Sequence, residues 1–444
     1  MTYDLENARP LAAVVLIVAF CWVLSEDRRR FPWLMMLGAL AVQAALVLLL
    51  FAIPNSQGVL NGVNAAVDGL ASATNKGTQF VFSYLGGGDG PYAKTNPGAP
   101  PPFIFGFQVL PLILVISALS ALLWHWGILK VIIRAFGFVF EKTMGLGGAS
   151  ATATAANIFM GMVESPIVIK AYLDKLTRSE LFLMMVVGLA TVAGSTMVAY
   201  AAILAPTLPN AAGHVLVASI ISAPAGILLA RIMIPEKKGA LGAGVDYASA
   251  LRYDSSMDAI TKGVQDGFMV IVNVAAMLIV FVAFVWIVNG VLPTLLSPVA
   301  LLLNPMLPDN LDLYPDRATL QVIFGYAFAP LAWIIGIPWS EAQVAGSLLG
   351  VKLFLTEFIA FIELGAVPEG VLSERSRMIM TYALCGFANV ASIGIMVGGM
   401  TTLMPERRQE ILALAWKSLA PGFLATCLAA AVVAALPRAM FATG

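Results

Sequence analysis

The feature that most constrains this chain is the repetition of long apolar segments along its length. A helix needs about 20 consecutive apolar residues to cross the hydrocarbon core of a bilayer, which is about 30 Å thick. The qualifying segments are residues 10–25, 33–53, 104–126, 181–205, 213–234, 268–290, 377–400 and 415–436. The sequence therefore predicts an all-α polytopic membrane protein with eight transmembrane helices.

Composition excludes the main alternatives to a membrane protein. The 444 residues are 60% hydrophobic and 11% charged, whereas soluble domains are roughly a quarter charged. A disordered chain would need low hydrophobicity and high net charge. The 25 basic residues equal the 25 acidic ones, so no basic surface favours nucleic acid as a partner. This composition instead predicts a protein surrounded by membrane lipid.

The Lys and Arg residues predict the orientation of the spans, because cytoplasmic loops are enriched in them. The basic clusters lie at residues 28–30, 130–142, 170–178, 231–238 and 407–408. Acidic residues mark the opposite loops: Asp4, Glu6, Asp309, Asp312 and Asp316. We therefore expect a multi-pass protein of the cell inner membrane with both termini on the periplasmic side. Arg375 and Arg377 fall on the outer side and oppose this orientation.

Several apolar segments do not read as simple spans. Residues 58–84, 127–142 and 317–335 are interrupted by polar residues or Gly, which is typical of helices that lie at the membrane interface. Residues 145–172 and 339–365 are rich in Gly, Ala and Ser, and each contains a glutamate. We expect these two segments to be re-entrant hairpins. Backbone that reverses inside a membrane is tolerated only where protein or a water-filled cavity satisfies its polar groups.

The two halves of the chain repeat one pattern. In each, a segment expected at the interface is followed by a glutamate-containing hairpin and then by a span interrupted by Gly and Ser. Arg178 to Ser195 is 17 positions, and Arg375 to Ser392 is also 17. The predicted topology makes the first hairpin enter from the cytoplasm and the second from outside. An inverted repeat with broken helices near the membrane midplane is typical of secondary transporters.

Glu164 and Glu357 are the strongest candidates for function. An ionised carboxylate in hydrocarbon costs several kcal/mol, so an intramembrane acid usually faces a cavity and serves a function. The alternative is a structural role as a buried pair or a helix cap. Asn389 and Ser392 are expected on one helix face, three positions apart, where they could bind a polyhydroxylated ligand. Hydrogen bonding between helices would also explain them.

A cation site is the second candidate feature. Asn157, Thr191 and Ser195 carry neutral oxygens suited to a partly dehydrated monovalent cation at an unwound helix. Hydrogen bonds from Thr and Ser to their own helix remain an equal alternative. The two histidines, His125 and His214, stand near no plausible nucleophile. We therefore do not expect an enzyme, an intramembrane hydrolase included.

Four stretches of the sequence resemble the concentrative nucleoside transporters. They are residues 157–166, residues 191–195, residues 325–333 and residues 352–389, the last being the most specific. The resemblance implies a homotrimer whose protomers have eight transmembrane helices, two re-entrant hairpins and interfacial helices. It implies that a hairpin-containing part of each protomer moves as an elevator against a trimeric scaffold.

The resemblance also implies roles for individual residues. Met162, Val163 and Glu164 would face the base, with Thr196 nearby. Phe387 would pack on the nucleoside, and Glu357, Asn389 and Ser392 would hydrogen-bond the ribose. The implied ligands of the co-transported sodium ion are Asn157, Thr191 and Ser195, together with the backbone carbonyls of Met160 and Val192.

This chain departs from the family pattern on the base side. Met162 and Val163 stand where the family usually has Gln followed by Thr or Ser, so hydrogen-bonding capacity is lost there. Thr196 replaces an aliphatic residue, and Thr356 stands where Asn is common. A site without polar groups discriminates poorly between analogues. We therefore expect atypical, broadened base recognition.

We therefore expect sodium-coupled nucleoside uptake, with proton-coupled transport of a nucleoside or nucleobase as the alternative. The predicted organisation begins with N-terminal scaffold spans and an interfacial helix, and then a third span with its interfacial helix. A first repeat, a connecting helix with a scaffold span, and a second repeat follow. In order, these parts cover residues 1–103, 104–143, 144–234, 235–316 and 317–444.

Overall fold

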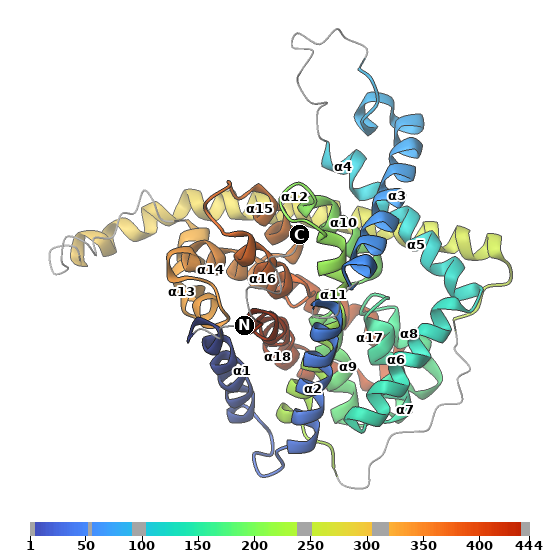
Figure 1. Ribbon diagram of the computed structural model, residues 1–444, viewed down its shortest axis with the longest axis horizontal. Coiled ribbons are helices and arrows are strands. Elements are labelled where there is room, and N and C mark those ends of the chain that lie inside the picture. The colour runs from blue at the N-terminus through green and yellow to red at the C-terminus, as the bar shows by residue number, and fades with distance from the viewer. Residues whose placement is uncertain (1–4, 52–55, 91–103, 238–250, 304–318, 437–444) are drawn as a thin grey trace.

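The protein is helical throughout the part of the chain that the computed structural model describes (Figure 1). The described residues are 5–51, 56–90, 104–237, 251–303 and 319–436. The acids Asp4, Asp309, Asp312 and Asp316, used above to orient the chain, lie outside them. The N-terminal elements are α1 (Leu5–Val23), α2 (Trp33–Phe51), α3 (Ser56–Phe82) and the 3₁₀ turn η1 (Ser83–Gly86).

The remaining elements fall into two series separated by the long helix α12. The first series is α4 (Phe105–Gln108), α5 (Leu110–His125), α6 (Ile128–Met144), α7 (Gly148–Asn157), α8 (Ser165–Val168), η2 (Lys170–Lys175), α9 (Arg178–Ala190), α10 (Gly194–Leu204) and α11 (Ala211–Met233). The second comprises α13 (Leu320–Ile334), α14 (Trp339–Phe354), α15 (Glu357–Ala366), α16 (Glu374–Leu384), α17 (Val390–Leu403), η6 (Pro405–Arg407) and α18 (Arg408–Ala434).

The two series share one order of elements. Two helices joined by a short turn come first, then two helices separated by a few non-helical residues, and then a long helix. In the first series these are α7–α8, α9–α10 and α11; in the second they are α14–α15, α16–α17 and α18. Both predicted spans 181–205 and 377–400 are thus divided into two helices.

Five described helical segments are long and apolar enough to cross a membrane: Phe105–His125, Arg178–Leu204, Ala211–Met233, Ser256–Pro298 and Pro405–Ala434. Three shorter apolar helices cover Ala8–Val23, Trp33–Leu48 and Val390–Leu403. Helices α13 and α14 are bent against each other by 117°. The predicted interfacial segments are helical as α3, α6 and α13, and their position at a membrane surface stays a prediction.

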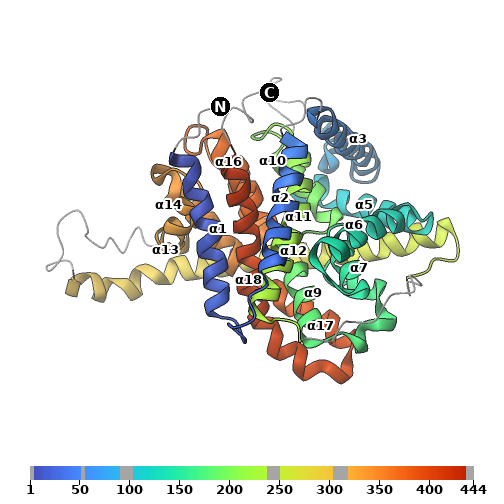
Figure 2. The ribbon, with the colours of Figure 1, turned by 60° about the horizontal axis from the view of Figure 1, so that its bottom comes forward.

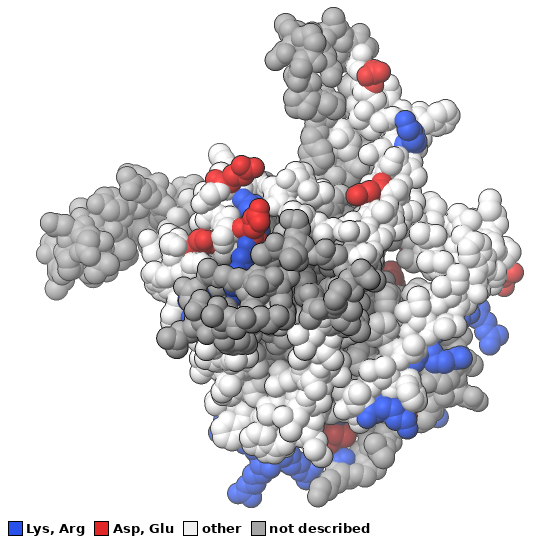
Figure 3. Space-filling model, viewed as in Figure 1, with Lys and Arg blue, Asp and Glu red and all other residues white. Residues whose placement is uncertain are grey.

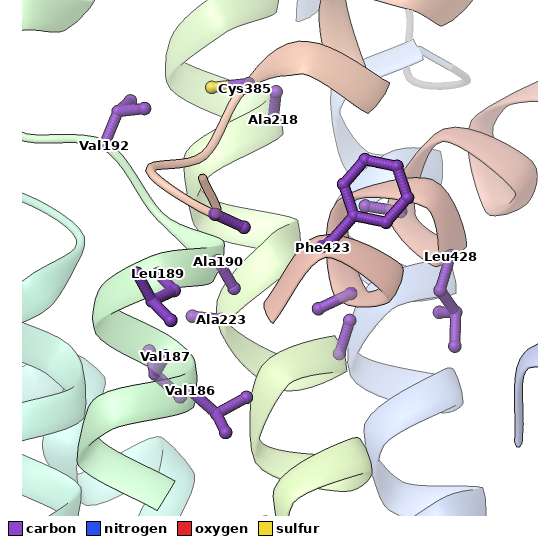
Figure 4. Close-up of a cluster of buried hydrophobic side chains, with 14 of the residues drawn as sticks. Val186, Val187, Leu189, Ala190, Val192, Ala218, Ala223, Cys385, Phe423 and Leu428 are labelled. Atoms are coloured by element: carbon purple, nitrogen blue, oxygen red, sulfur yellow. The ribbon is translucent and has the colours of Figure 1, made fainter. Parts of the chain in front are cut away.

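The core lies where the two series meet. Helices α11 and α18 stand side by side with α1, α2 and α16 (Figure 2). Val187 and Leu189 of α9 pack with Ala218 of α11 and Leu428 of α18 in one buried apolar cluster (Figure 4). The cluster is rich in Ala and Val, and such small side chains let helix backbones approach closely in a membrane protein. Helices α11 and α18 thereby pack against both divided helices, through α9 and α16.

Helix α12 (Ser256–Leu303) is different from the rest. The sequence predicted a span at 268–290, but the helix has 48 residues and crosses the molecule (Figure 1). Its main neighbour is α5. The two helices pack closely because Gly267 has no side chain: a Cβ there would lie 2.9 Å from the Cβ of Ser117. None of its most apolar 18-residue window is buried.

Charged side chains are distributed unevenly over the surface. Most of the Lys and Arg side chains visible in Figure 3 gather toward its lower edge, and most of the Asp and Glu side chains lie in its upper half. On the basic side, Glu26 in the loop between α1 and α2 forms ion pairs with Arg178 and Lys417 at 3.0 and 2.9 Å. This loop thereby joins α1 and α2 to both series.

Candidate functional site

The site is built around the two places where helices are interrupted. Helix α9 ends at Ala190 and α10 begins at Gly194. Helix α16 ends at Leu384 and α17 begins at Val390. Each interruption leaves backbone carbonyls and N–H groups without partners in their own helix, so these groups are free to bind other atoms.

The two interruptions touch each other. The backbone N–H of Phe387 donates to the carbonyl oxygen of Thr191 at 3.3 Å. Gly386 permits this approach, because a Cβ there would lie 2.8 Å from the Ala190 carbonyl oxygen and 2.6 Å from Cγ2 of Thr426. The unwound segments of the two series therefore meet inside the molecule.

The turn between α7 and α8 carries the first glutamate. Glu164 precedes α8, and its Oε2 accepts a hydrogen bond from the backbone N–H of Gly161 at 3.0 Å. The carboxylate thus closes the turn on itself. Met162 and Val163 lie between these two residues, so the turn presents two apolar side chains beside one acid.

The second glutamate begins a helix. Thr356 is the N-cap of α15, its hydroxyl accepting the Ile359 N–H at 3.2 Å, and Glu357 is the first helical residue. A helix N-terminus carries partial positive charge and stabilises an adjacent carboxylate. The Glu357 side chain is therefore held at the N-terminal end of α15 in a buried position.

Two side chains fix the Glu357 carboxylate. The Tyr200 hydroxyl donates to Oε1 at 2.7 Å, and Nδ2 of Asn389 donates to Oε2. The Tyr200 ring is stacked on Phe361, with ring centroids 4.4 Å apart. Tyr200 and Asn389 come from α10 and from the start of α17, so both interrupted helices hold the same carboxylate.

The prediction that Asn389 and Ser392 share a helix face is wrong in one respect. Asn389 precedes α17 as its N-cap, and its Oδ1 accepts the backbone N–H of Ser392 at 2.7 Å. An Asn at this position satisfies a helix N–H that lacks an intrahelical partner. The amide nitrogen is thereby directed to Glu357, and the Ser392 hydroxyl stays available.

A cavity of about 410 Å³ lies between these elements. It is lined by the turn between α7 and α8, by both interrupted helices and by the start of α15. The lining includes every residue that the sequence analysis proposed to bind substrate: Met162, Val163, Glu164, Thr196, Glu357, Phe387, Asn389 and Ser392. Glu164 and Glu357, 193 positions apart in the sequence, thus face one space.

Sequence reasoning missed two parts of this site. One wall of the cavity is α12, which contributes Asn273, Val274 and Met277. Tyr200, which holds Glu357, was also missed. An aromatic residue inside an apolar span reads as core, and only its hydroxyl, which needs a partner when buried, could have drawn attention to it.

The proposed cation ligands lie beside the first interruption. The Thr191 hydroxyl donates to the Asn157 carbonyl oxygen at 3.0 Å, and the Ser165 hydroxyl donates to Asn157 Oδ1 at 2.6 Å. Val192 is completely buried next to them, whereas Ser195 faces the large cavity. Met160 and Ser195 also line a neighbouring cavity of about 90 Å³.

The atoms gathered here are neutral oxygens. Among the described residues, no group of three or more His, Cys, Asp or Glu side chains could hold a metal ion. Hard monovalent cations are bound by carbonyl and hydroxyl oxygens rather than by nitrogen or sulfur. The chemistry of this set therefore suits an alkali-metal ion and not a transition metal.

The sequence matches three models of known protein families. Residues 12–85 match the family model of the Na+ dependent nucleoside transporter N-terminus, and residues 214–434 match that of its C-terminus. Residues 106–207 match a model described as nucleoside recognition. Together the three models cover most of the chain.

Whole proteins match over nearly their full lengths. An uncharacterized transporter of Haemophilus influenzae is 34% identical over 427 residues, which are 95% of this chain and 96% of that protein. The nucleoside permease NupC of Helicobacter pylori is 32% identical, with 95% of each protein covered. The chain belongs to the concentrative nucleoside transporter family. It is a transporter of this family and not an enzyme.

Solved structures of this transporter family share the fold. CNTnw in an inward-facing, substrate-bound state superposes with a TM-score of 0.84 at 31% identity, covering 97% of this chain and 98% of that one. A CNTnw double variant in an outward-facing state superposes equally well, with a TM-score of 0.84 at 30% identity.

Proposed function

We propose that this transporter couples the entry of sodium to the uptake of nucleosides across the inner membrane. The observation that carries the proposal is the cavity of about 410 Å³. It is lined both by Glu164 from the first series and by Glu357 from the second. The cavity is large enough for a small polar ligand and touches both interrupted helices. Its acids, amide and hydroxyl match a polyhydroxylated substrate.

The ribose side of this site consists of Glu357, Asn389 and Ser392. An ionised carboxylate accepts two hydrogen bonds from vicinal hydroxyls, which makes the ribose diol its natural partner. The aromatic ring of Phe387 packs against the nucleoside. Because Glu357 is already held by Tyr200 and Asn389, its orientation costs little on binding.

The base side consists of Met162, Val163, Glu164 and Thr196. Thr196 uses its hydroxyl proton in a bond to the Ala193 carbonyl at 2.9 Å, so it offers the base only an acceptor. Glu164 is the one ionisable side chain in this set. We infer that base recognition is broadened relative to other family members.

The cation site is proposed at Asn157, Thr191 and Ser195, with the carbonyls of Met160 and Val192. Asn157 supports this assignment. Its Nδ2 is buried and has no hydrogen-bond partner among the described residues, while Oδ1 accepts from Ser165. Turning the amide by 180° lets Nδ2 donate to Ser165 and brings Oδ1 to the open position, where an oxygen can bind sodium.

The proposed mechanism is an elevator movement in a homotrimer. The repeated parts of the two series, α7–α11 and α14–α18, with α7–α8 and α14–α15 as re-entrant hairpins, would carry the substrate past α5 and α12. The long, unburied α12 supports its role as scaffold. Eight spans are proposed, with both termini in the periplasm; the uneven charge distribution in Figure 3 supports this orientation.

The experiment is an uptake panel in proteoliposomes. Radiolabelled adenosine, guanosine, uridine, cytidine and 2′,3′-dideoxyuridine are each offered with sodium, with choline, and with choline at acid pH inside and outside. We expect sodium-dependent uptake of both purine and pyrimidine ribonucleosides and weak uptake of the dideoxy compound. Strict selectivity for one base would contradict the broadened base side, and uptake that needs acid pH instead of sodium would select proton coupling.

A matched pair of variants on α15 completes the experiment. Glu357→Gln keeps the shape of the side chain and loses charge-assisted bonds worth roughly 1.5–3 kcal/mol each, so we expect uptake to fall sharply. Glu363→Gln on the same helix, whose carboxylate is bound by Gln321 at 3.4 Å, is the control and should transport normally. Normal uptake by Glu357→Gln would refute the ribose assignment.

A further inference from the structure

Lys352 on α14 is a buried cation that the mechanism above does not use. Its side chain is 0% exposed. An ammonium group in the interior is costly unless polar groups surround it. Among the ion pairs of the described residues none includes Lys352, so a carboxylate does not compensate its charge directly.

Oxygen atoms from two other helices surround the ammonium. Nζ donates to the carbonyl oxygen of Ala383 at 2.7 Å and to Oγ1 of Thr426 at 2.6 Å, and it lies 5.3 Å from the ring centre of Phe423. Ala383 is in the last turn of α16, where carbonyls lack intrahelical partners. The Thr426 hydroxyl gives its proton to the Phe423 carbonyl, so it faces Lys352 as an acceptor.

The three helices joined by Lys352 are α14, α16 and α18. Their counterparts in the first series are α7, α9 and α11, and the proposed sodium ligands lie where those three meet. Asn157 ends α7, Thr191 follows α9, and Ser219 on α11 lies 3.4 Å from the Val192 carbonyl oxygen. In the described structure, the hydrogen bonds of these three side chains involve backbone and other neutral groups, with no Lys or Arg.

We propose that Lys352 is a tethered cation that occupies, in the second series, the place at which the first series binds sodium. This inference rests on the sodium site proposed above. The hydrogen bonds of this tethered group hold α14 against the end of α16 without a mobile ion. The half of the site that follows α16 is therefore formed without an ion, whereas the half beside Asn157 is completed only when sodium binds.

Lys352 then acts as a positioning residue for the ribose side. The chain leaves α16 one residue after Ala383 and runs directly to Phe387 and Asn389. On α14, the same lysine lies five positions before Glu357. Removing the ammonium frees two segments that carry ribose-binding groups and leaves the sodium ligands untouched.

The test measures sodium and nucleoside binding separately in detergent-purified full-length protein. Thermal unfolding is followed with choline chloride, with sodium chloride, and with sodium chloride plus a uridine or adenosine series. Lys352→Met is compared with Lys175→Met, an exposed lysine on η2. We expect Lys352→Met to keep the sodium-induced rise in Tm and to weaken nucleoside binding roughly tenfold or more. Lys175→Met should resemble the wild type in both.

A second variant covers the case in which Lys352→Met does not fold. Thr426→Val keeps the lysine and removes one of its acceptors, so nucleoside binding should weaken in the same direction and by a smaller factor. Wild-type nucleoside binding in a folded Lys352→Met or Thr426→Val would overturn the proposal. So would an equal loss of the sodium and nucleoside effects, since that is the result of general loosening. Absence of both effects in the wild type would instead refute the proposed function itself.

Discussion

At the scale of single residues, the site depends on a few polar side chains placed in apolar surroundings. Glu164 and Glu357 could be found from the sequence because an acid inside an apolar segment is costly and therefore conspicuous. Asn389 was found for its chemistry but placed wrongly, since helix periodicity does not reveal that α17 begins only after it. Tyr200 escaped notice because its ring fits a span as well as any core residue does.

Tyr200→Phe tests the part of the site that the sequence did not reveal. The variant keeps the ring stacked on Phe361 and removes the hydroxyl that donates to Glu357 at 2.7 Å. Since a hydrogen bond to a charged group is worth about 1.5–3 kcal/mol, we expect the KM for ribonucleosides to rise roughly tenfold, with little change in KM for sodium.

Tyr382→Phe is the matched control for this measurement. Tyr382 is equally buried, and its hydroxyl contacts Nδ1 of His214 at 3.1 Å instead of a cavity residue. Its nucleoside KM should stay near the wild-type value. If both Phe variants raise KM equally, the effect comes from the loss of any buried hydroxyl and the specific role of Tyr200 is disproved.

At the scale of elements, the order of helices followed from the sequence better than their bounds did. Gly and Ser marked both interrupted helices. The length of α12 was not foreseen, because hydropathy detects apolar sequence and not helix. The helix continues through the polar stretch 256–266 and past Pro293 and Pro298. Its packing on α5 joins residues that are far apart in the sequence, such as Ser117 and Gly267, which are 150 positions apart. Hydrophobic periodicity does not predict such contacts.

Gly386→Ala tests the contact between the two interruptions. The added methyl group would lie 2.8 Å from the Ala190 carbonyl oxygen and 2.6 Å from Thr426 Cγ2, so the segments must separate. Overpacking of this kind costs about 1–3 kcal/mol. We expect a lower Tm and strongly reduced uptake. Gly394→Ala on α17, where a Cβ meets no atom within 4 Å, should behave as the wild type.

At the scale of the whole molecule, the two series form one body and α12 lies across it with its apolar surface uncovered. Phe268, Ile279 and Trp286 are among its exposed side chains. Association of chains depends on surfaces that meet only after folding, so the oligomer was expected from family resemblance and not from any pattern within the sequence.

The stoichiometry of transport is a property of the whole molecule. The single sodium site proposed above, with the tethered ammonium as its counterpart, predicts that each neutral nucleoside enters with one sodium ion. A tenfold sodium gradient is worth about 1.4 kcal/mol, so it should sustain about a tenfold nucleoside gradient when the voltage is clamped at zero with potassium and valinomycin. Accumulation approaching the square of the sodium ratio would show a second ion and contradict this prediction.

The bond between Phe387 N–H and the Thr191 carbonyl has a consequence for energy coupling. Thr191 belongs to the proposed ion site and Phe387 to the proposed substrate site, and a single backbone hydrogen bond links them. If an ion binds at Thr191, we expect a small displacement of the backbone there to reach Phe387, whose ring is proposed to pack on the nucleoside. The ion and the nucleoside can therefore influence each other's affinity without direct contact.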